Sequence, residues 1–141
     1  MQWYLDFVLW FNKKMRIILI FLMFKMSLFG SSLKVGENAP SFVLNDQDGK
    51  QHQLSDYKGK KLVIYFFPKA FTPGWTKQAC GLRDNYSEFI VNNISVLGVS
   101  YDSESKLLEF KEKYNLEFDL LSDFKKTMGE LYDVNSFYFF P

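Results

Sequence analysis

One segment of the chain has the layout of a site for thiol chemistry, with a residue of the wrong type at its centre. Pro68 ends the apolar run KLVIYFF, and Thr72-Pro73 begins a segment that reaches Cys80. The unpaired amides and the dipole of a helix that begins there would favour a negative charge in its first turn. A cysteine at such a place becomes a thiolate near neutral pH. Position 75 is instead occupied by Trp75, whose indole ring forms no thiolate.

Local signals predict the two elements that position this segment. Residues 61–67 are rich in β-branched and aromatic side chains, which is typical of a buried strand. Thr72 offers a hydroxyl that can cap the first helical amides, and proline is favoured at the first helical position. We therefore expect one helix over residues 73–91. Its inner face is expected to carry Ala79, Leu82, Tyr86, Phe89 and Ile90.

The rest of the chain from residue 33 onward alternates between strand and helix patterns. The expected order is a strand pair at about 41–44 and 51–54, a strand at 94–101, a helix at 103–114, a strand at 118–121 and a helix at 124–132. Strands that alternate with helices indicate an α/β sheet with crossover connections.

The run LVIYFFPKAFTPGWTKQACGLRDNYSEF resembles the active-site region of the peroxiredoxins, and within them the bacterioferritin comigratory protein (PrxQ) group. That group's pattern is Pro-x-x-x-Thr-x-x-Cys, with a second cysteine five residues further along the same helix. Pro68 and Thr72 match the first two positions, and Cys80 matches the second, resolving cysteine. Trp75 stands where the peroxidatic cysteine belongs. The similarity extends over about residues 33–134, through LKVGENAP, ISVLGVSYDS and FKEKYNLEFDLLSD.

The resemblance implies a thioredoxin-like fold and an antioxidant thiol peroxidase. Such proteins are expected to reduce hydrogen peroxide and organic hydroperoxides and to be regenerated by a thioredoxin-like reductant. The first thiolate becomes a sulfenic acid, and the second cysteine condenses with it to a disulfide. The resemblance further implies that Thr72 orients the peroxide, that Pro68 shields the thiolate, and that an arginine from a later strand supports the negative charge.

Two departures from the family pattern predict that the chain as written is inactive. The first is Trp75. The second is the arginine, since the sequence has only Arg16 and Arg83, and neither stands at the matching position. The chain stops at NSFYFFP where the family continues, so we expect a C-terminally incomplete thioredoxin-like fold. The alternatives are a catalytically dead relative that keeps a surface for thioredoxin or for dimerisation, and a non-functional gene fragment.

The spacing of positions 75 and 80 carries an expectation of its own. Residues five apart on a helix are separated by about 7.5 Å along the axis and by about 140° around it. A disulfide does not span that separation without backbone movement, so the helix must open during turnover in an active relative. In this chain Trp75 is expected either to occupy the space shaped for a thiol or to swing outward.

Cys80 and His52 are the single cysteine and the single histidine of the chain. Cys80 could be a resolving thiol, but the lack of a partner thiol favours a small buried residue on the inner helix face. One cysteine and one histidine make no ligand set, so we expect no metal ion and no cofactor. His52 is expected to be a solvated strand residue, and Asp46-Gln-Asp48-Gly49 is expected to form a turn.

Residues 1–32 are predicted to be a leader, and residues 33–141 the truncated peroxiredoxin-like domain. Lys13, Lys14 and Arg16 precede an apolar run at 17–24, which is the order of a secretory signal. The chain would then be exported or periplasmic; with a mis-called start codon it would be cytoplasmic. Lys25 interrupts the apolar run before the roughly 20 residues that a membrane span needs, so membrane contact is expected only through residues 1–32. The net charge of +1 argues against a nucleic-acid partner.

Overall fold

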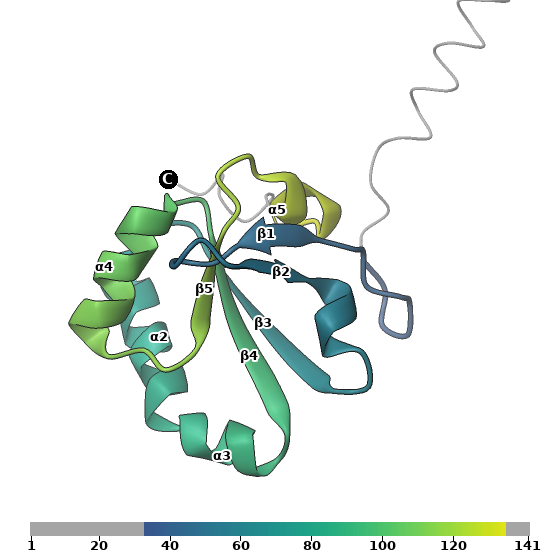
Figure 1. Cartoon of the computed structure of the whole chain (residues 1–141), viewed down its shortest axis with the longest axis horizontal. Helices are drawn as coiled ribbons and strands as arrows, with labels where there is room; N and C mark the ends of the chain where they lie inside the picture. The colour runs from purple at the N-terminus through teal and green to yellow at the C-terminus, as the bar shows by residue number, and fades with distance from the viewer. Residues whose placement is uncertain (1–32, 135–141) are drawn as a thin grey trace, which may run out of the picture. The chain divides into compact units, whose positions relative to one another are not determined.

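Two small sheets organise residues 33–134, the part of the chain that the computed structural model describes (Figure 1). The first is an antiparallel hairpin of β1 (Val43–Asn45) and β2 (Gln51–Gln53). The second contains β3 (Lys61–Phe67), β4 (Ile94–Ser100) and β5 (Asp119–Ser122), which are parallel in the order β3-β4-β5. The predicted α/β sheet is therefore confirmed, and each predicted strand lies within two residues of its observed bounds.

The turn of the hairpin forms where the sequence predicts it. The Asp46 amide donates a hydrogen bond of 2.8 Å to the Lys50 carbonyl, and the Gly49 amide donates one of 3.0 Å to the Asp46 carbonyl. Gly49 has a φ of 79°, a left-handed conformation that glycine adopts without steric cost. The Asp46 carboxylate fastens the turn from inside by accepting hydrogen bonds from the amides of Asp48 and Lys50.

The helices are α2 (Pro73–Asp84), α3 (Tyr86–Val91), α4 (Glu104–Tyr114) and α5 (Thr127–Leu131), with a short 3₁₀ helix, η1 (Leu54–Tyr57). The prediction of one helix over 73–91 is wrong, because the helix breaks at Asn85. The side-chain amide of Asn85 donates to the Gly81 carbonyl at 2.8 Å, while its backbone amide turns to Arg83. An asparagine side chain that takes over a backbone acceptor competes with the helical ladder. The break also leaves Ile90 60% exposed, so Ile90 does not belong to the inner face.

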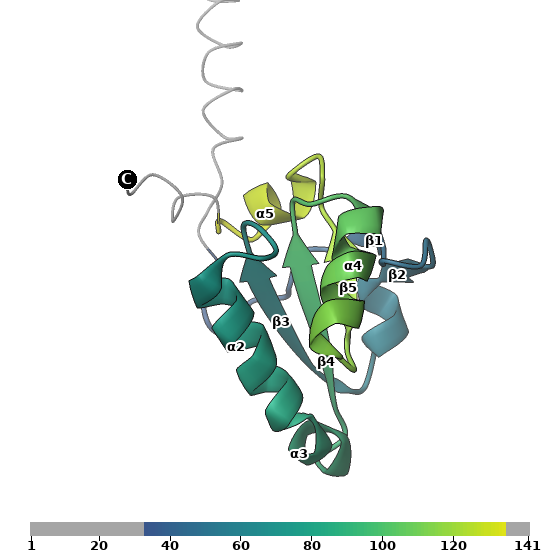
Figure 2. The same cartoon turned by 90° about the vertical axis from the view of Figure 1, so that its left-hand side faces the viewer.

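The parallel sheet has α2, α3 and α4 on one side, the helical face, and the hairpin, η1 and α5 on the other, the hairpin face (Figures 1 and 2). Its alternating side chains build a core on each face. Buried residues on the helical face include Phe67, Ala79, Val96, Leu107, Phe110, Phe118 and Leu120. Those on the hairpin face are Phe42, Leu97, Val99, Leu121 and Met128. This arrangement fixes the carboxyl end of β3 against the start of α2.

Gly98 sets how closely side chains approach the middle of β4 on the helical face. A Cβ atom at this position would lie 2.6 Å from Leu120 Cδ2 and 3.2 Å from Phe67 Cε1. A contact of 2.6 Å is closer than real Cβ atoms show, so any side chain at this position would force the buried Leu120 side chain to shift.

Within residues 33–134, no helix combines the length and the apolar character needed to cross a bilayer. The leader predicted at residues 1–32 lies outside the described residues.

Candidate functional site

The loop between β3 and α2 carries the residues that the sequence analysis singled out. Pro68 follows directly on Phe67, the buried last residue of β3. Ala70 is buried, and its amide donates a hydrogen bond of 2.6 Å to Asp102 Oδ2. The loop is therefore anchored to the segment that follows β4, the neighbouring parallel strand.

Asp102 is a fixed point for this loop that the sequence analysis missed. Its Oδ2 also accepts a hydrogen bond of 3.0 Å from Ser100 Oγ, and its Oδ1 lies 3.1 Å from the Lys106 ammonium. The Asp102 side chain is 10% exposed. Its position in the sequence could have indicated this role. Asp102 comes just after β4, and the carboxyl ends of the parallel strands β3 and β4 lie at the same edge of the sheet.

Phe71 adopts a backbone conformation that few side chains tolerate. Its φ is 66°, in the left-handed region. The ring packs edge-on against Phe110, with ring centres 5.1 Å apart, and lies 6.2 Å from the ring of Tyr114. The Lys113 ammonium lies 5.4 Å from the centre of the Phe71 ring. These contacts offset the backbone cost and hold the loop from the side of α4.

Thr72 begins α2 as predicted, with Pro73 at the first helical position. The predicted hydroxyl cap is wrong, because Thr72 Oγ1 donates its hydrogen bond to the Lys69 carbonyl at 3.0 Å. The first-turn amides are therefore left without a bond to this side chain. Thr76 Oγ1 is buried and has no hydrogen-bond partner among residues 33–134.

Trp75 lies in the first turn of α2 and is half-buried against the core of the helical face. Its ring centre is 6.3 Å from that of Tyr65, at an angle of 50°. The Tyr65 hydroxyl donates a hydrogen bond of 3.0 Å to the Trp75 carbonyl. Burial raises the pKa of the Tyr65 phenol well above its usual range, so the hydroxyl remains a donor at neutral pH. Of the two expected placements, the indole adopts one directed toward the core.

Cys80 is a free thiol on α2 and is half-buried. The prediction that Cys80 is a buried residue on the inner face of the helix is wrong, because it is only half-buried. The neighbouring Ala79, which is 1% exposed, is the buried residue on that face. The continuous helix keeps positions 75 and 80 apart by about 7.5 Å along the axis. The structure thus places all four predicted site residues on the loop and on α2, but it does not bring Trp75 and Cys80 together.

The guanidinium group of Arg83 does not contact the first turn of α2, where the family pattern would need an arginine. Its Nη1 donates to the Tyr114 carbonyl at 2.7 Å, and its Nε and Nη2 bind Asp84 Oδ1. It lies eight residues after Trp75, or about 12 Å along the helix axis. Arg83 therefore connects the end of α2 to the end of α4.

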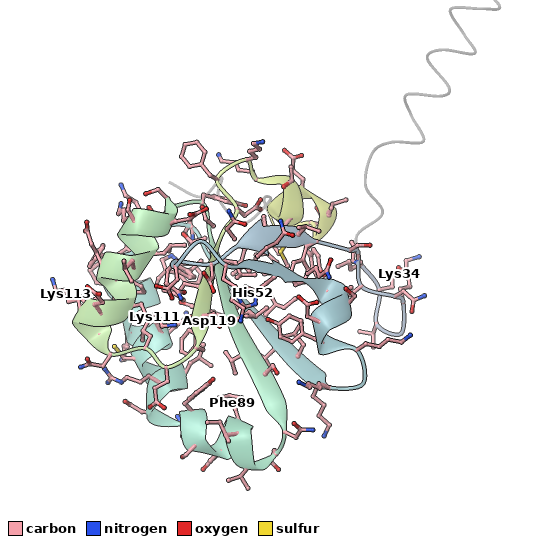
Figure 3. The ribbon with its side chains drawn as sticks, in the orientation of Figure 1. Lys34, His52, Phe89, Lys111, Lys113 and Asp119 are labelled. Carbon is pink, nitrogen blue, oxygen red and sulfur yellow. The ribbon has the colours of Figure 1, made fainter. Side chains whose placement is uncertain are left out.

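A second polar cluster lies apart from this loop, between the hairpin and β5 (Figure 3). His52 is 6% exposed, and its ring nitrogens lie 2.7 Å from the Tyr57 hydroxyl and 2.8 Å from Asp46 Oδ2. The prediction that His52 is solvated is therefore wrong. The alternation of β2 turns this side chain inward, where Tyr57 and Asp46, both near in the sequence, pair with its two ring nitrogens and make its burial possible.

Comparisons with known proteins identify the family. Residues 35–137 match the model of the AhpC/TSA family. The chain is 50% identical over 102 residues to peroxiredoxin Bcp of Escherichia coli, a match that covers 72% of this chain and 65% of the relative. The chain thus spans just under two thirds of the length of that protein.

Solved structures give the same result. The crystal structure of peroxidoxin BcpB from Mycobacterium tuberculosis is similar with a TM-score of 0.69 and 35% identity, over 72% of this chain and 66% of that one. Peroxiredoxin Q of Xanthomonas campestris is similar with a TM-score of 0.65 and 34% identity, over 66% of this chain and 59% of that one. The chain therefore belongs to the AhpC/TSA family and, within it, to the Bcp or PrxQ group of peroxiredoxins, with a thioredoxin-like fold.

Proposed function

We propose that this chain has the scaffold of a thioredoxin-dependent thiol peroxidase for hydrogen peroxide and organic hydroperoxides, and that Trp75 blocks the reaction. The proposal assigns this role to residues 33–141, with residues 1–32 as a separate leader. Membership of the peroxiredoxins supports the reaction class. The position of Trp75 in the first turn of α2, directly after the loop that follows β3, carries the proposed block.

The proposed reaction needs a thiolate in that first turn. With a cysteine at position 75, the helix amides and dipole would favour the thiolate. Its sulfur would attack one peroxide oxygen, so that an S–O bond forms, the O–O bond breaks, and the leaving oxygen takes a proton. Cys80 would then attack the sulfenic sulfur, release water and form a disulfide that a dithiol reductant reduces. Tryptophan offers no sulfur for the first step.

Two neighbours of position 75 suit the roles that the family implies for them. The Thr72 hydroxyl donates to Lys69, which leaves its oxygen free to accept a hydrogen bond from a peroxide O–H. Pro68 has no amide hydrogen and sits between the buried Phe67 and the anchored Ala70, where its ring can limit the access of water. In this proposal Thr72 orients the peroxide and Pro68 shields the reacting sulfur.

A second candidate is a binding module that has lost catalysis but keeps its surface for a thiol reductant or for a second copy. The anchoring of the loop favours it. Ala70 is held by Asp102 and Phe71 by Phe110, and neither contact involves residue 75. The loop can thus keep its shape with any side chain at that position.

Peroxide consumption coupled to thioredoxin and its reductase tests the proposal. The unaltered chain and Trp75→Ser, which opens space without adding a thiol, are expected to give no turnover. Trp75→Cys is expected to form a sulfenic acid that dimedone traps, and then a disulfide with Cys80 that is absent in Trp75→Cys/Cys80→Ser.

Turnover by the unaltered chain would contradict the block at Trp75. A folded Trp75→Cys protein that peroxide does not oxidise would contradict the proposal that Trp75 alone blocks the reaction and would favour the binding module.

A further inference from the structure

The cluster between the hairpin and β5 combines one imidazole and two carboxylates from separate parts of the chain. Asp46 and His52 flank the hairpin turn and are buried, and Asp119 is the first residue of β5. One ligand-type atom of each residue lies within 4.8 Å of those of the other two. We propose that Asp46, His52 and Asp119 bind one divalent first-row transition-metal ion, with Zn²⁺ as the best match.

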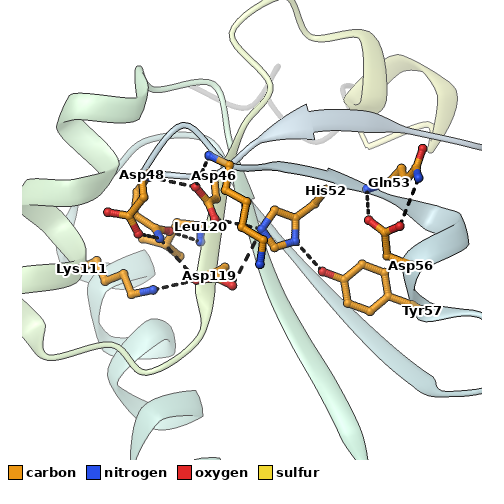
Figure 4. A network of polar contacts seen from close by, with 11 residues as sticks. Asp46, Asp48, His52, Gln53, Asp56, Tyr57, Lys111, Asp119 and Leu120 are labelled. Carbon is orange, nitrogen blue, oxygen red and sulfur yellow. Dashed lines mark hydrogen bonds and ion pairs between the residues drawn. The ribbon is translucent and has the colours of Figure 1, made fainter.

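His52 is held in an orientation that suits a metal ligand (Figure 4). Its Nδ1 lies 2.7 Å from the Tyr57 hydroxyl. Its Nε2 faces both carboxylates, at 2.8 Å from Asp46 Oδ2 and 3.9 Å from Asp119 Oδ2. A metal-binding histidine usually has its second nitrogen fixed by a hydrogen bond, as Tyr57 does here.

Asp46 presents one oxygen to the cluster and uses the other for the turn. Its Oδ1 accepts hydrogen bonds of 2.9 Å from the amides of Asp48 and Lys50. These bonds fix the carboxylate, which is part of a residue that is 2% exposed. Its Oδ2 is left to face His52, so this ligand needs little reorganisation to bind an ion.

Asp119 likewise uses one carboxylate oxygen for contacts outside the cluster and presents the other to His52. Its Oδ1 lies 2.8 Å from the Lys111 ammonium and accepts a hydrogen bond of 3.3 Å from the Gln47 side chain. Asp119 Oδ2 makes none of the hydrogen bonds found among residues 33–134, and it lies 3.9 Å from His52 Nε2. This oxygen is the open acceptor of the cluster.

Charge and space both favour a cation here. Two aspartate side chains face one imidazole, and the Lys111 ammonium pairs with only one of the two, from outside the cluster. Tyr57 and Asp119 also line a cavity of about 290 Å³ beside the cluster, so the cluster is open to solvent on the side of Asp119, although His52 and Asp46 do not line the cavity. Three protein ligands and one water make an open tetrahedral site for Zn²⁺. The nitrogen ligand disfavours Mg²⁺ and Ca²⁺, which prefer oxygen alone.

A count of cysteine and histidine does not predict this proposed ligand set, because two of its three ligands are aspartates. Asp46 and His52 are six residues apart, but Asp119 is 67 residues after His52 in the sequence. Only the packing of β5 beneath the hairpin, where Asp46 bridges to Leu121, brings the third ligand to the other two.

Titration of the full-length, metal-free chain with Zn²⁺ by calorimetry, and with Co²⁺ by visible absorption, tests the site. We expect one ion per chain and the intense visible bands of tetrahedral Co²⁺. Asp119→Asn and His52→Gln should each weaken binding by at least about tenfold, the loss typical of damage at a metal site. Lys111→Gln should tighten binding by up to about tenfold, because it removes a competing positive charge.

Two matched controls separate the site from general effects. Glu117→Gln removes the same charge two residues before Asp119, on an exposed side chain, and Cys80→Ser removes the only thiol. Both should bind Zn²⁺ as the unaltered chain does. Zn²⁺ should also raise the melting temperature of the unaltered chain but not that of Asp119→Asn, which keeps the test valid if His52→Gln does not fold.

Absence of binding at millimolar Zn²⁺ overturns the proposal. So does binding that survives Asp119→Asn in a folded protein, and so does binding that Cys80→Ser abolishes.

Discussion

The Tyr65 hydroxyl on β3 donates a hydrogen bond of 3.0 Å to the carbonyl oxygen of Trp75 on α2. The bond joins the middle of a strand to the first turn of the helix that follows it. It holds position 75 through the backbone, so the identity of the side chain there is not what fixes the turn. The indole adds a contact of its own with the Tyr65 ring.

Tyr65→Phe should lower the free energy of unfolding by about 1 kcal/mol, because it removes this hydrogen bond and leaves the ring in place. Urea unfolding followed by circular dichroism measures the loss. Tyr86→Phe is the matched control, since no hydrogen bond of its hydroxyl to another residue of 33–134 is present. Equal losses in the two variants would contradict a specific role for Tyr65.

Asp102→Ala should lower the free energy of unfolding by about 2–3 kcal/mol, because the carboxylate holds a buried amide and a hydroxyl with charge-assisted bonds. Amide exchange in residues 68–72 should become faster than in the rest of the domain, as measured by hydrogen–deuterium exchange and mass spectrometry. Lys106→Met removes the more exposed ion-pair partner and should cost less than about 1 kcal/mol. Uniformly faster exchange over the whole domain would argue against a local anchor.

Two glycine-to-alanine changes should alter the free energy of unfolding in opposite directions. Gly98→Ala should destabilise by about 1–3 kcal/mol, because the new methyl group collides with Leu120 and Phe67 in the core. Gly81→Ala adds a methyl group on an exposed face of α2 with no atom within 4 Å, and should stabilise by about 1 kcal/mol. Thermal and urea unfolding of both variants check the pair. A stabilised Gly98→Ala protein would contradict the close packing at β4.

Alkaline stability should depend on Tyr57. Burial, together with the negative charges of Asp119, Asp56 and Asp46, raises the pKa of the Tyr57 phenol to about 12. The folded state therefore binds this proton more tightly than the unfolded chain, in which tyrosine has a pKa of about 10. The resulting stability is fully present below about pH 10 and is lost as the pH rises from there through about pH 12.

Tyr57→Phe should accordingly lose less stability than the unaltered chain over that window. Urea unfolding at several pH values in EDTA, with tyrosinate absorbance recorded in parallel, measures the two slopes. If the free energy of unfolding falls with pH equally steeply in the two proteins, the pKa of Tyr57 is not raised in the folded state.

The sequence predicts best those features that a few neighbouring residues determine. The strand at 61–67 is reproduced residue for residue, and Thr72-Pro73 marks the start of α2, because both depend on local propensity and on helix-start chemistry. The turn before Lys50 is likewise local. The family pattern around Pro68 and Cys80 belongs to the same class of signal, since it lies within one loop and one helix.

Some of the features that the sequence analysis missed depend on partners far away in the sequence, and others on a choice between competing local contacts. The loop anchor joins Ala70 to Asp102, and the cluster around His52 gains Asp119 from β5 at 3.9 Å. At Asn85, either the backbone amide or the side-chain amide can donate to the Gly81 carbonyl. Helix propensity alone does not predict that the side chain does so and that the helix breaks there. The loop anchor forms only after the strands have been brought side by side, whereas the break at Asn85 is decided by a contact between residues four apart.

The anchoring of the loop at residues 70 and 71 has an evolutionary consequence. The contacts that hold the loop come from Asp102 and Phe110, whereas the proposed peroxide chemistry depends on position 75. A lineage could lose the nucleophile in one codon and still produce a chain with the ancestral shape. Inheritance of the fold and inheritance of the reaction are then separate, because different residues determine them.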